Sequence, residues 1–257
     1  MSTLAAPRDA LRNTPRAAPD GFEYALARLH ARQAWRASEP TWQRLHAARS
    51  LPALLDVARS TTLAPYVAGI VVAATLPQID LAFQTQLRGR IDEVAGWMPA
   101  PWQPAARWTA SLIDLPARLR EQHERGSSHQ AHSALDPVPG IEHGVHHRST
   151  ALSGQPASPH PALAAWLHTW QQRWPSNCTA LAAWSRRLAA DLTALAAAEP
   201  ATAPALREQL ATRLAGDLHA RAAPPQIAPF AFLALLALDL KRLRGECMRA
   251  RLTMEAP

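Results

Sequence analysis

Leucine and alanine recur every three or four residues along most of the 257-residue chain, and this spacing constrains the fold more than any other feature. Residues three and four apart lie on one face of an α-helix, so the pattern predicts amphipathic helices that bury one side. The 23 prolines fall between these stretches or in their first turns, where a helix tolerates a residue without an N–H. Only 10 glycines and few β-branched residues are present, so the chain has little material for sheets. The sequence therefore predicts an all-α fold.

The spacing predicts helices in two groups. In the first group, helices begin near Asp20, Ser38 and Ser50, side chains that can accept a hydrogen bond at a helix N-terminus. The second group ends with a helix over Phe230–Leu252, which we expect to pack through Leu233, Leu236, Leu240 and Leu243. The predicted architecture is a bundle of short antiparallel helices in two lobes, with a loose tail over 1–20, lobes over 21–125 and 161–257, and a flexible His- and Pro-rich linker over 126–160.

Three further segments carry predictions of their own. Residues Ser60–Ile79 have no charge, and we interpret their apolar centre as a buried helix rather than a membrane span, since threonines and prolines dilute both ends. A helix is also expected from Pro104 to Arg125. Trp166, Trp170 and Trp174 recur at every fourth position, which favours a packed core face over a surface that stacks nucleobases or grips a partner.

The chain carries a formal charge of +7 from 27 basic residues, of which only Lys241 is a lysine. Positive charge attracts nucleic acid, anionic lipid or an acidic protein. The arginines are scattered along polar helix faces rather than gathered in one block, a pattern typical of a solvated surface. Cys178 and Cys247 are too few for a disulfide framework, and residues 1–20 lack the apolar core of a signal peptide. Both observations indicate a cytoplasmic protein.

No segment carries a recognisable catalytic motif: there is no glycine-rich phosphate loop, no Gly-x-Ser-x-Gly turn and no His-Glu-x-x-His helix. Seven of the 11 histidines lie between His123 and His160, close enough to share a zinc, nickel or copper ion. No carboxylate or thiolate framework accompanies them, so a solvated linker of biased composition is the favoured interpretation. We therefore predict no catalytic residues, no metal site and no cofactor.

Three segments together resemble the C subunit, called d in eukaryotes, of rotary V-type and archaeal ATPases. The first combines Tyr24–Arg32 with Trp42, Leu45, the Ser50–Leu55 helix and Pro65-Tyr66, in the order of that family's N-terminal helices. The second is Trp108–Asp114 with Leu119-Arg120, and the third is Leu235–Arg244, where Asp239 stands at a position that is usually Glu. Members of the family are typically longer by several helices, and here the histidine-rich segment takes the place of the middle.

The resemblance implies a non-catalytic subunit that couples the central stalk to the membrane rotor. Its partners would be the rotor-ring and stalk proteins, with no nucleic acid, and it would reach the inner membrane only as a peripheral protein held by a protein partner. The candidate partner-binding residues are arginines on the polar sides of the family-like helices: Arg28, Arg32, Arg120 and Arg244. Two alternatives stay open, a helical adaptor of another complex and a basic helical protein that binds nucleic acid.

Overall fold

The computed structural model describes residues 21–33, 36–113, 161–199, 201–220 and 223–253. Within these ranges the backbone forms helices and turns and no strand, which confirms the all-α prediction. The helices are α1 (Glu23–Gln33), α2 (Glu39–Ala47), α3 (Leu51–Arg59), α4 (Ala64–Val67), α5 (Leu76–Trp97), η1 (Ala100–Trp102), α6 (Gln103–Trp108), η2 (Thr109–Ile113), α8 (Pro161–Gln171), α9 (Thr179–Ala197), α10 (Ala203–His219) and α11 (Ile227–Leu252). The expected tail over 1–20, the linker over 126–160 and its histidine cluster lie outside the described residues.

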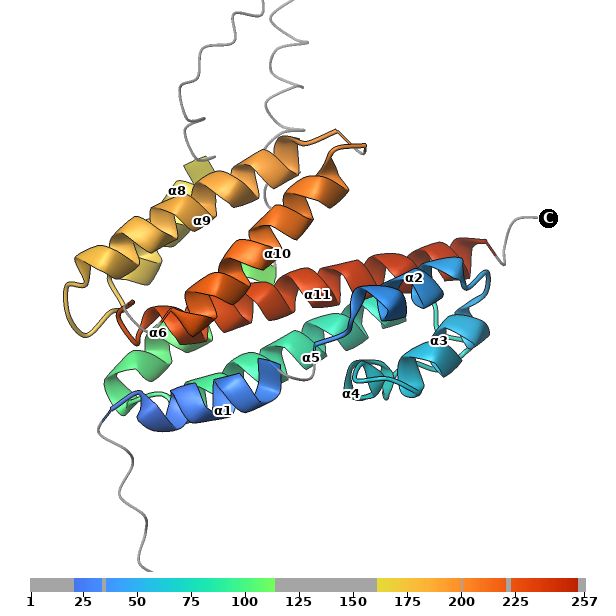
Figure 1. Ribbon diagram of the computed structural model, residues 1–257, viewed down its shortest axis with the longest axis horizontal. Coiled ribbons are helices and arrows are strands. Elements are labelled where there is room, and N and C mark those ends of the chain that lie inside the picture. The colour runs from blue at the N-terminus through green and yellow to red at the C-terminus, as the bar shows by residue number, and fades with distance from the viewer. Residues whose placement is uncertain (1–20, 34–35, 114–160, 200, 221–222, 254–257) are drawn as a thin grey trace, which may run out of the picture.

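The 26-residue helix α11 organises the fold, with a length of about 39 Å at 1.5 Å per residue. It packs against α10, α5, α1 and α3, and α5 lies alongside it (Figure 1). The predicted packing face is confirmed, because Leu233, Leu236, Leu240 and Leu243 are all buried. The helix begins at Ile227 rather than at Phe230. Pro229 falls in its first turn, where a missing N–H breaks no hydrogen bond.

The buried apolar side chains form two clusters, and α11 belongs to both. Its first half packs with α1, α6 and α8–α10 in a cluster that is rich in tryptophan and phenylalanine, here called the aromatic cluster. Its second half, from Leu236 to Ala250, packs with α2, α3 and the start of α5 in a mainly leucine-lined cluster, here called the aliphatic cluster. Each cluster joins residues from before and after the gap at 114–160. The described residues therefore do not divide into the two expected lobes, 21–125 and 161–257.

The uncharged run Ser60–Ile79 is not the buried helix that we expected. Hydroxyl groups end α3, because Ser60 Oγ donates to Val57 O at 2.8 Å and Thr61 Oγ1 donates to Ala58 O at 2.8 Å. The four-residue α4 and a series of turns follow, and α5 then starts with a capping box at Thr75. Two valines of these turns, 71 and 72, are 63% and 45% exposed. None of the helices in the described ranges is long and apolar enough to cross a membrane.

The helix expected from Pro104 to Arg125 is also shorter than predicted within the described residues. It passes into a 3-10 helix at Thr109, whose Oγ1 donates to Ala106 O at 2.6 Å, and Ser111 Oγ donates to Trp108 O at 2.7 Å. Such bonds to the carbonyl three residues back favour the tighter helix.

The tryptophan row packs as a core feature, as predicted, although α8 ends before Trp174. Trp170 is 2% exposed, and Trp166 and Trp174 pack against the same cluster as partly buried side chains. The rings of Trp166 and Trp170 are stacked with their centroids 5.4 Å apart, and Trp174 meets Trp170 edge-on at 5.2 Å.

Candidate partner-binding groove

A groove of about 960 Å³ runs between α2 and the first half of α10, and the exposed side of α11 forms its floor. Figure 1 shows α10 meeting α11 near the start of α11 and diverging from it toward the first residues of α10. Each helix turns one stripe of residues, spaced three and four apart, toward the groove. The stripes are Glu39, Trp42, Gln43, His46 and Ala47 on α2, Pro204, Ala205, Arg207, Glu208 and Ala211 on α10, and Leu238, Asp239, Lys241, Arg242, Gly245 and Glu246 on α11.

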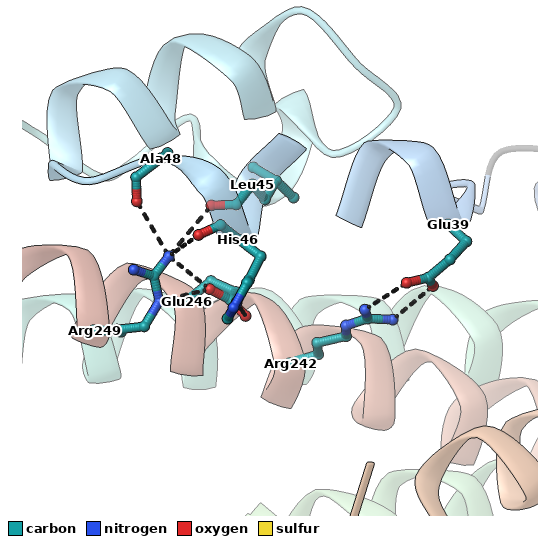
Figure 2. A network of polar contacts seen from close by, with 7 residues as sticks. All are labelled: Glu39, Leu45, His46, Ala48, Arg242, Glu246 and Arg249. Atoms are coloured by element: carbon teal, nitrogen blue, oxygen red, sulfur yellow. Dashed lines mark hydrogen bonds and ion pairs between the residues drawn. The ribbon is translucent and has the colours of Figure 1, made fainter. Parts of the chain in front are cut away.

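Helix α2 forms one wall of the groove. Arg242 of α11 holds the start of this helix. The two terminal nitrogens of Arg242 donate to the two carboxylate oxygens of Glu39, each at 3.1 Å (Figure 2). The same guanidinium lies over the ring of Trp42, 4.6 Å from its centroid. A paired, planar contact of this kind fixes orientation as well as distance, so α2 keeps its rotation relative to α11.

At the other end of α2, Arg249 caps the helix. Its Nη2 donates to His46 O at 2.8 Å, to Ala48 O at 3.1 Å and to Leu45 O at 3.4 Å (Figure 2). The last carbonyls of a helix have no partner within the helix, and a cation there also opposes the helix dipole. Nε of Arg249 donates to Glu246 Oε2 at 3.0 Å, so the cap is itself held in place.

His46 completes this contact between α2 and α11. Its Nδ1 lies 3.2 Å from Glu246 Oε1, and the imidazole is 71% exposed beside the groove. Glu246 therefore contacts both His46 and Arg249, and is only 17% exposed. The polar contacts of the α2 wall thus lie next to solvent, where charged contacts contribute little energy singly and exchange readily.

The groove is close to neutral in charge. Four basic side chains line it, Arg36, Arg207, Lys241 and Arg242, and so do four carboxylates, Glu39, Glu208, Asp239 and Glu246. Nucleic-acid binding depends on neutralising many phosphates with an excess of cations, which this surface does not offer. Mixed charges around small residues such as Ala205 and Gly245 suit a protein helix better.

A smaller cavity of about 60 Å³ opens next to the groove and shares Arg36, Ala37 and Asp239 with it. Arg36 donates from Nε and Nη2 to the two oxygens of Asp239, at 2.8 and 2.9 Å. These hydrogen bonds raise the pKa of the Arg36 guanidinium further above its ordinary value. Arg32 and Arg90, both bound to Glu93, line the far side of the cavity.

The structure does not gather the predicted partner-binding arginines into one site. Arg28 is exposed, and its Nε donates to Tyr24 Oη at 3.1 Å on the same helix. Arg32 pairs with Glu93 at 2.7 Å, whereas Arg244 pairs with Asp80 at 2.5 Å, about 20 Å away along α5. Arg120 lies outside the described residues. Three of the four thus have partners within the chain, and their role at a partner surface stays a prediction.

The sequence did not predict the groove residues, because those that contact each other lie some 200 positions apart in the chain. One signal was present: Asp239, Arg242, Glu246 and Arg249 follow each other at steps of three and four on α11, with alternating sign. Such a stripe indicates a helix face that meets charges of another helix.

Among the described residues, no group of three or more His, Cys, Asp or Glu side chains is placed to hold a metal ion. The comparisons with known proteins find no family model, no curated protein and no solved structure that the chain matches. Any function must therefore be argued from the groove itself and from the sequence resemblance.

Proposed function

We propose that this chain is a non-catalytic connector, which holds a helical segment of a protein partner in the groove between α2, α10 and α11. The observation that carries the proposal is the groove, in which three helices each turn one stripe toward a common trough. A fourth helix would complete the bundle, in the mode by which amphipathic helices bind grooves. Small residues on the floor and walls, among them Ala47, Ala205 and Gly245, let a helix backbone approach closely.

The more specific form of the proposal is a connector of a V-type-ATPase-like rotary complex, between the rotor ring and the central stalk. Its support is the resemblance of the Tyr24–Arg32, Ser50–Leu55 and Leu235–Arg244 segments. These segments fall on α1, α3 and α11, and α11 packs against both of the others. A helical adaptor of another complex would use the same groove with other partners. The near-neutral groove disfavours the nucleic-acid alternative.

To test the proposal, a substitution places a large side chain in the groove at a position where the fold has room for it. Gly245 lies exposed in α11, and a Cβ added there would meet no atom within 4 Å. Gly245→Trp therefore places a large ring in the groove. Gly216→Trp is the matched control, because Gly216 is also an exposed helical glycine with open space above it and does not line the groove.

Tagged full-length chains are purified from their own cells in mild detergent. We expect the parent and Gly216→Trp chains to retain a membrane-bound complex that contains rotary-ATPase subunits, and Gly245→Trp to lose it at least tenfold. Retention of a different complex with the same dependence on Gly245 would favour the adaptor form. Recovery of only the free chain, of nucleic acid, or of equal amounts with both variants would contradict a partner-binding groove.

A further inference from the structure

The small cavity beside the groove is built from four separate parts of the chain. Arg32 and Arg36 approach it from α1 and the segment after it, and Tyr66 comes from α4. Arg90 and Trp97 line it from α5, and α11 closes it with Leu236 and Asp239 among others. Charged groups brought together from so many elements form a defined site rather than a feature of one helix surface.

Basic groups outnumber acidic groups around this cavity. Three guanidiniums, those of Arg32, Arg36 and Arg90, face two carboxylates, those of Glu93 and Asp239. Glu93 accepts from Arg32 at 2.7 Å and from Arg90 at 2.5 Å, and Asp239 takes both hydrogen bonds of Arg36. The lining therefore holds one more guanidinium than carboxylates, and the planar guanidinium group matches the geometry of a carboxylate.

The remaining wall of the cavity is apolar and aromatic. Leu63, Val94 and Leu236 line it and are buried members of the two clusters. The guanidinium of Arg90 lies over the ring of Tyr66, 5.5 Å from its centroid, and that of Arg32 lies 6.0 Å from the ring centroid of Trp97. These contacts with the rings keep two guanidiniums of the lining in position. The lining thus combines guanidiniums with apolar and aromatic side chains.

Tyr66 contributes a neutral hydroxyl to this environment. Burial raises the pKa of its phenol above the ordinary value of 10, more than the nearby arginines lower it. The hydroxyl therefore stays protonated at neutral pH and can donate a hydrogen bond to an anion.

We propose that this cavity binds one carboxylate side chain, an Asp or Glu of the partner helix seated in the adjoining groove. The inference rests on the proposed function and adds the chemistry of the partner's anchor. Arg36 and Asp239 line both spaces, so the cavity lies directly beside the groove in which the partner helix would sit. A cavity of about 60 Å³ has room for roughly four or five water-sized groups, which is the size of the end of a glutamate side chain.

The first experiment uses propionate, which has the atoms of a glutamate side chain, and propionamide as its uncharged control. Each is titrated into the full chain while the indole N–H signal of Trp97 is followed by NMR, with Trp97→Phe to assign it. We expect saturable shifts with propionate in the millimolar range, as befits so small a ligand, and none with propionamide. Equal shifts with both compounds, or none with either, would overturn the inference.

Two variants locate the binding. Thr62 is exposed and lines the cavity, so Thr62→Glu supplies an internal carboxylate without removing any arginine, and Thr62→Gln is its neutral control. We expect propionate to bind at least tenfold more weakly to Thr62→Glu and to Arg90→Gln, and normally to Thr62→Gln. Circular dichroism checks that each variant keeps its helices. Unchanged binding to Thr62→Glu in a folded chain would contradict the site.

The same variants separate this inference from the proposed function. If partner capture depends on Gly245 but is unaffected by Thr62→Glu and Arg90→Gln, the groove stands and the carboxylate anchor fails. If propionate binds as expected but no partner depends on Gly245, the proposed function fails and the anion site stands as a property of the cavity alone. Loss of capture with both sets of variants supports the two proposals together.

Discussion

In the aromatic cluster two indole N–H groups, those of Trp170 and Trp184, donate to acceptors inside the protein, whereas in the aliphatic cluster the polar contacts lie around its edge. Trp170 is buried, and its Nε1 donates to Ala105 O at 2.9 Å; Trp184 Nε1 donates to Asp217 at 2.8 Å. Around the aliphatic cluster, arginine–carboxylate pairs join α11 to α2 and α5, as Arg242–Glu39 and Arg244–Asp80 do.

This difference separates what holds the fold together from what is available for recognition. Buried indole contacts are fixed by packing and are insensitive to salt. Exposed charge pairs contribute about 0–1 kcal/mol each and weaken as salt screens them. The groove lies beside exposed charge pairs. A partner can therefore replace one of these pairs with a contact of its own at small cost to the stability of the core.

The largest effect should come from the aromatic cluster. Trp170→Ala removes a ring that contacts Trp166, Trp174 and Phe230, and we expect a loss of about 3–5 kcal/mol in the free energy of unfolding. Urea unfolding measures it, and the loss should be the same at low and high salt. Leu252→Ala is the control, because Leu252 is 52% exposed and its truncation should change stability by no more than about 0.5 kcal/mol. A loss under about 1 kcal/mol for Trp170→Ala would show that this ring is not part of the packed core.

A smaller effect, and one that salt changes, should come from the edge of the aliphatic cluster. Arg249→Gln removes the cap from the carbonyls at the end of α2 and leaves Glu246 with only His46, so we expect a loss of about 1–2 kcal/mol. Urea unfolding in increasing sodium chloride should show the difference from the parent chain shrinking. Arg107→Gln breaks an exposed pair with Asp92 at 3.6 Å and an exposed hydrogen bond to Gln103 at 3.2 Å, and should cost less than about 0.5 kcal/mol. A loss that is independent of salt would mean that Arg249 acts through its hydrogen bonds to carbonyls or its packing and not through its charge.

The smallest effect concerns Cys247, which is fully buried in the aliphatic cluster. Burial raises the pKa of its thiol to about 12, so the folded chain keeps a proton that the unfolded chain releases near pH 9. The contribution of this thiol to the free energy of unfolding is fully present below pH 8 and decreases as the pH rises above 9. Between pH 8 and 10 the parent should lose about 1 kcal/mol more than Cys247→Ala, by urea unfolding at each pH. Parallel stability curves for the two chains would show that the thiol is not shielded as described.

The spacing of apolar residues along the sequence predicted which face of a single helix is buried. The face of α11 that carries Leu240 and Leu243 follows directly from steps of three and four residues. The same approach failed at Ser60–Ile79, because hydroxyl bonds to nearby carbonyls compete with the helix and are not visible in apolar spacing.

Predicting the groove requires knowing how several helices pack together, which no single segment of the sequence shows. Whether Glu39 meets Arg242 depends on how α2 lies on α11. That arrangement depends in turn on α3, which packs against both α2 and α11. The alternating charges on α11 could have indicated that some charged helix packs there, but not which one.

The place of α11 in both cores has a consequence for synthesis on the ribosome. This helix follows every other described helix in the chain, so neither core can close until it has been made. Roughly 170 residues separate the end of α3 from the start of α11, which takes about 10–30 s at typical rates of translation. During that interval the aliphatic cluster lacks its contacts with α11, and we expect chaperones to bind the nascent chain there.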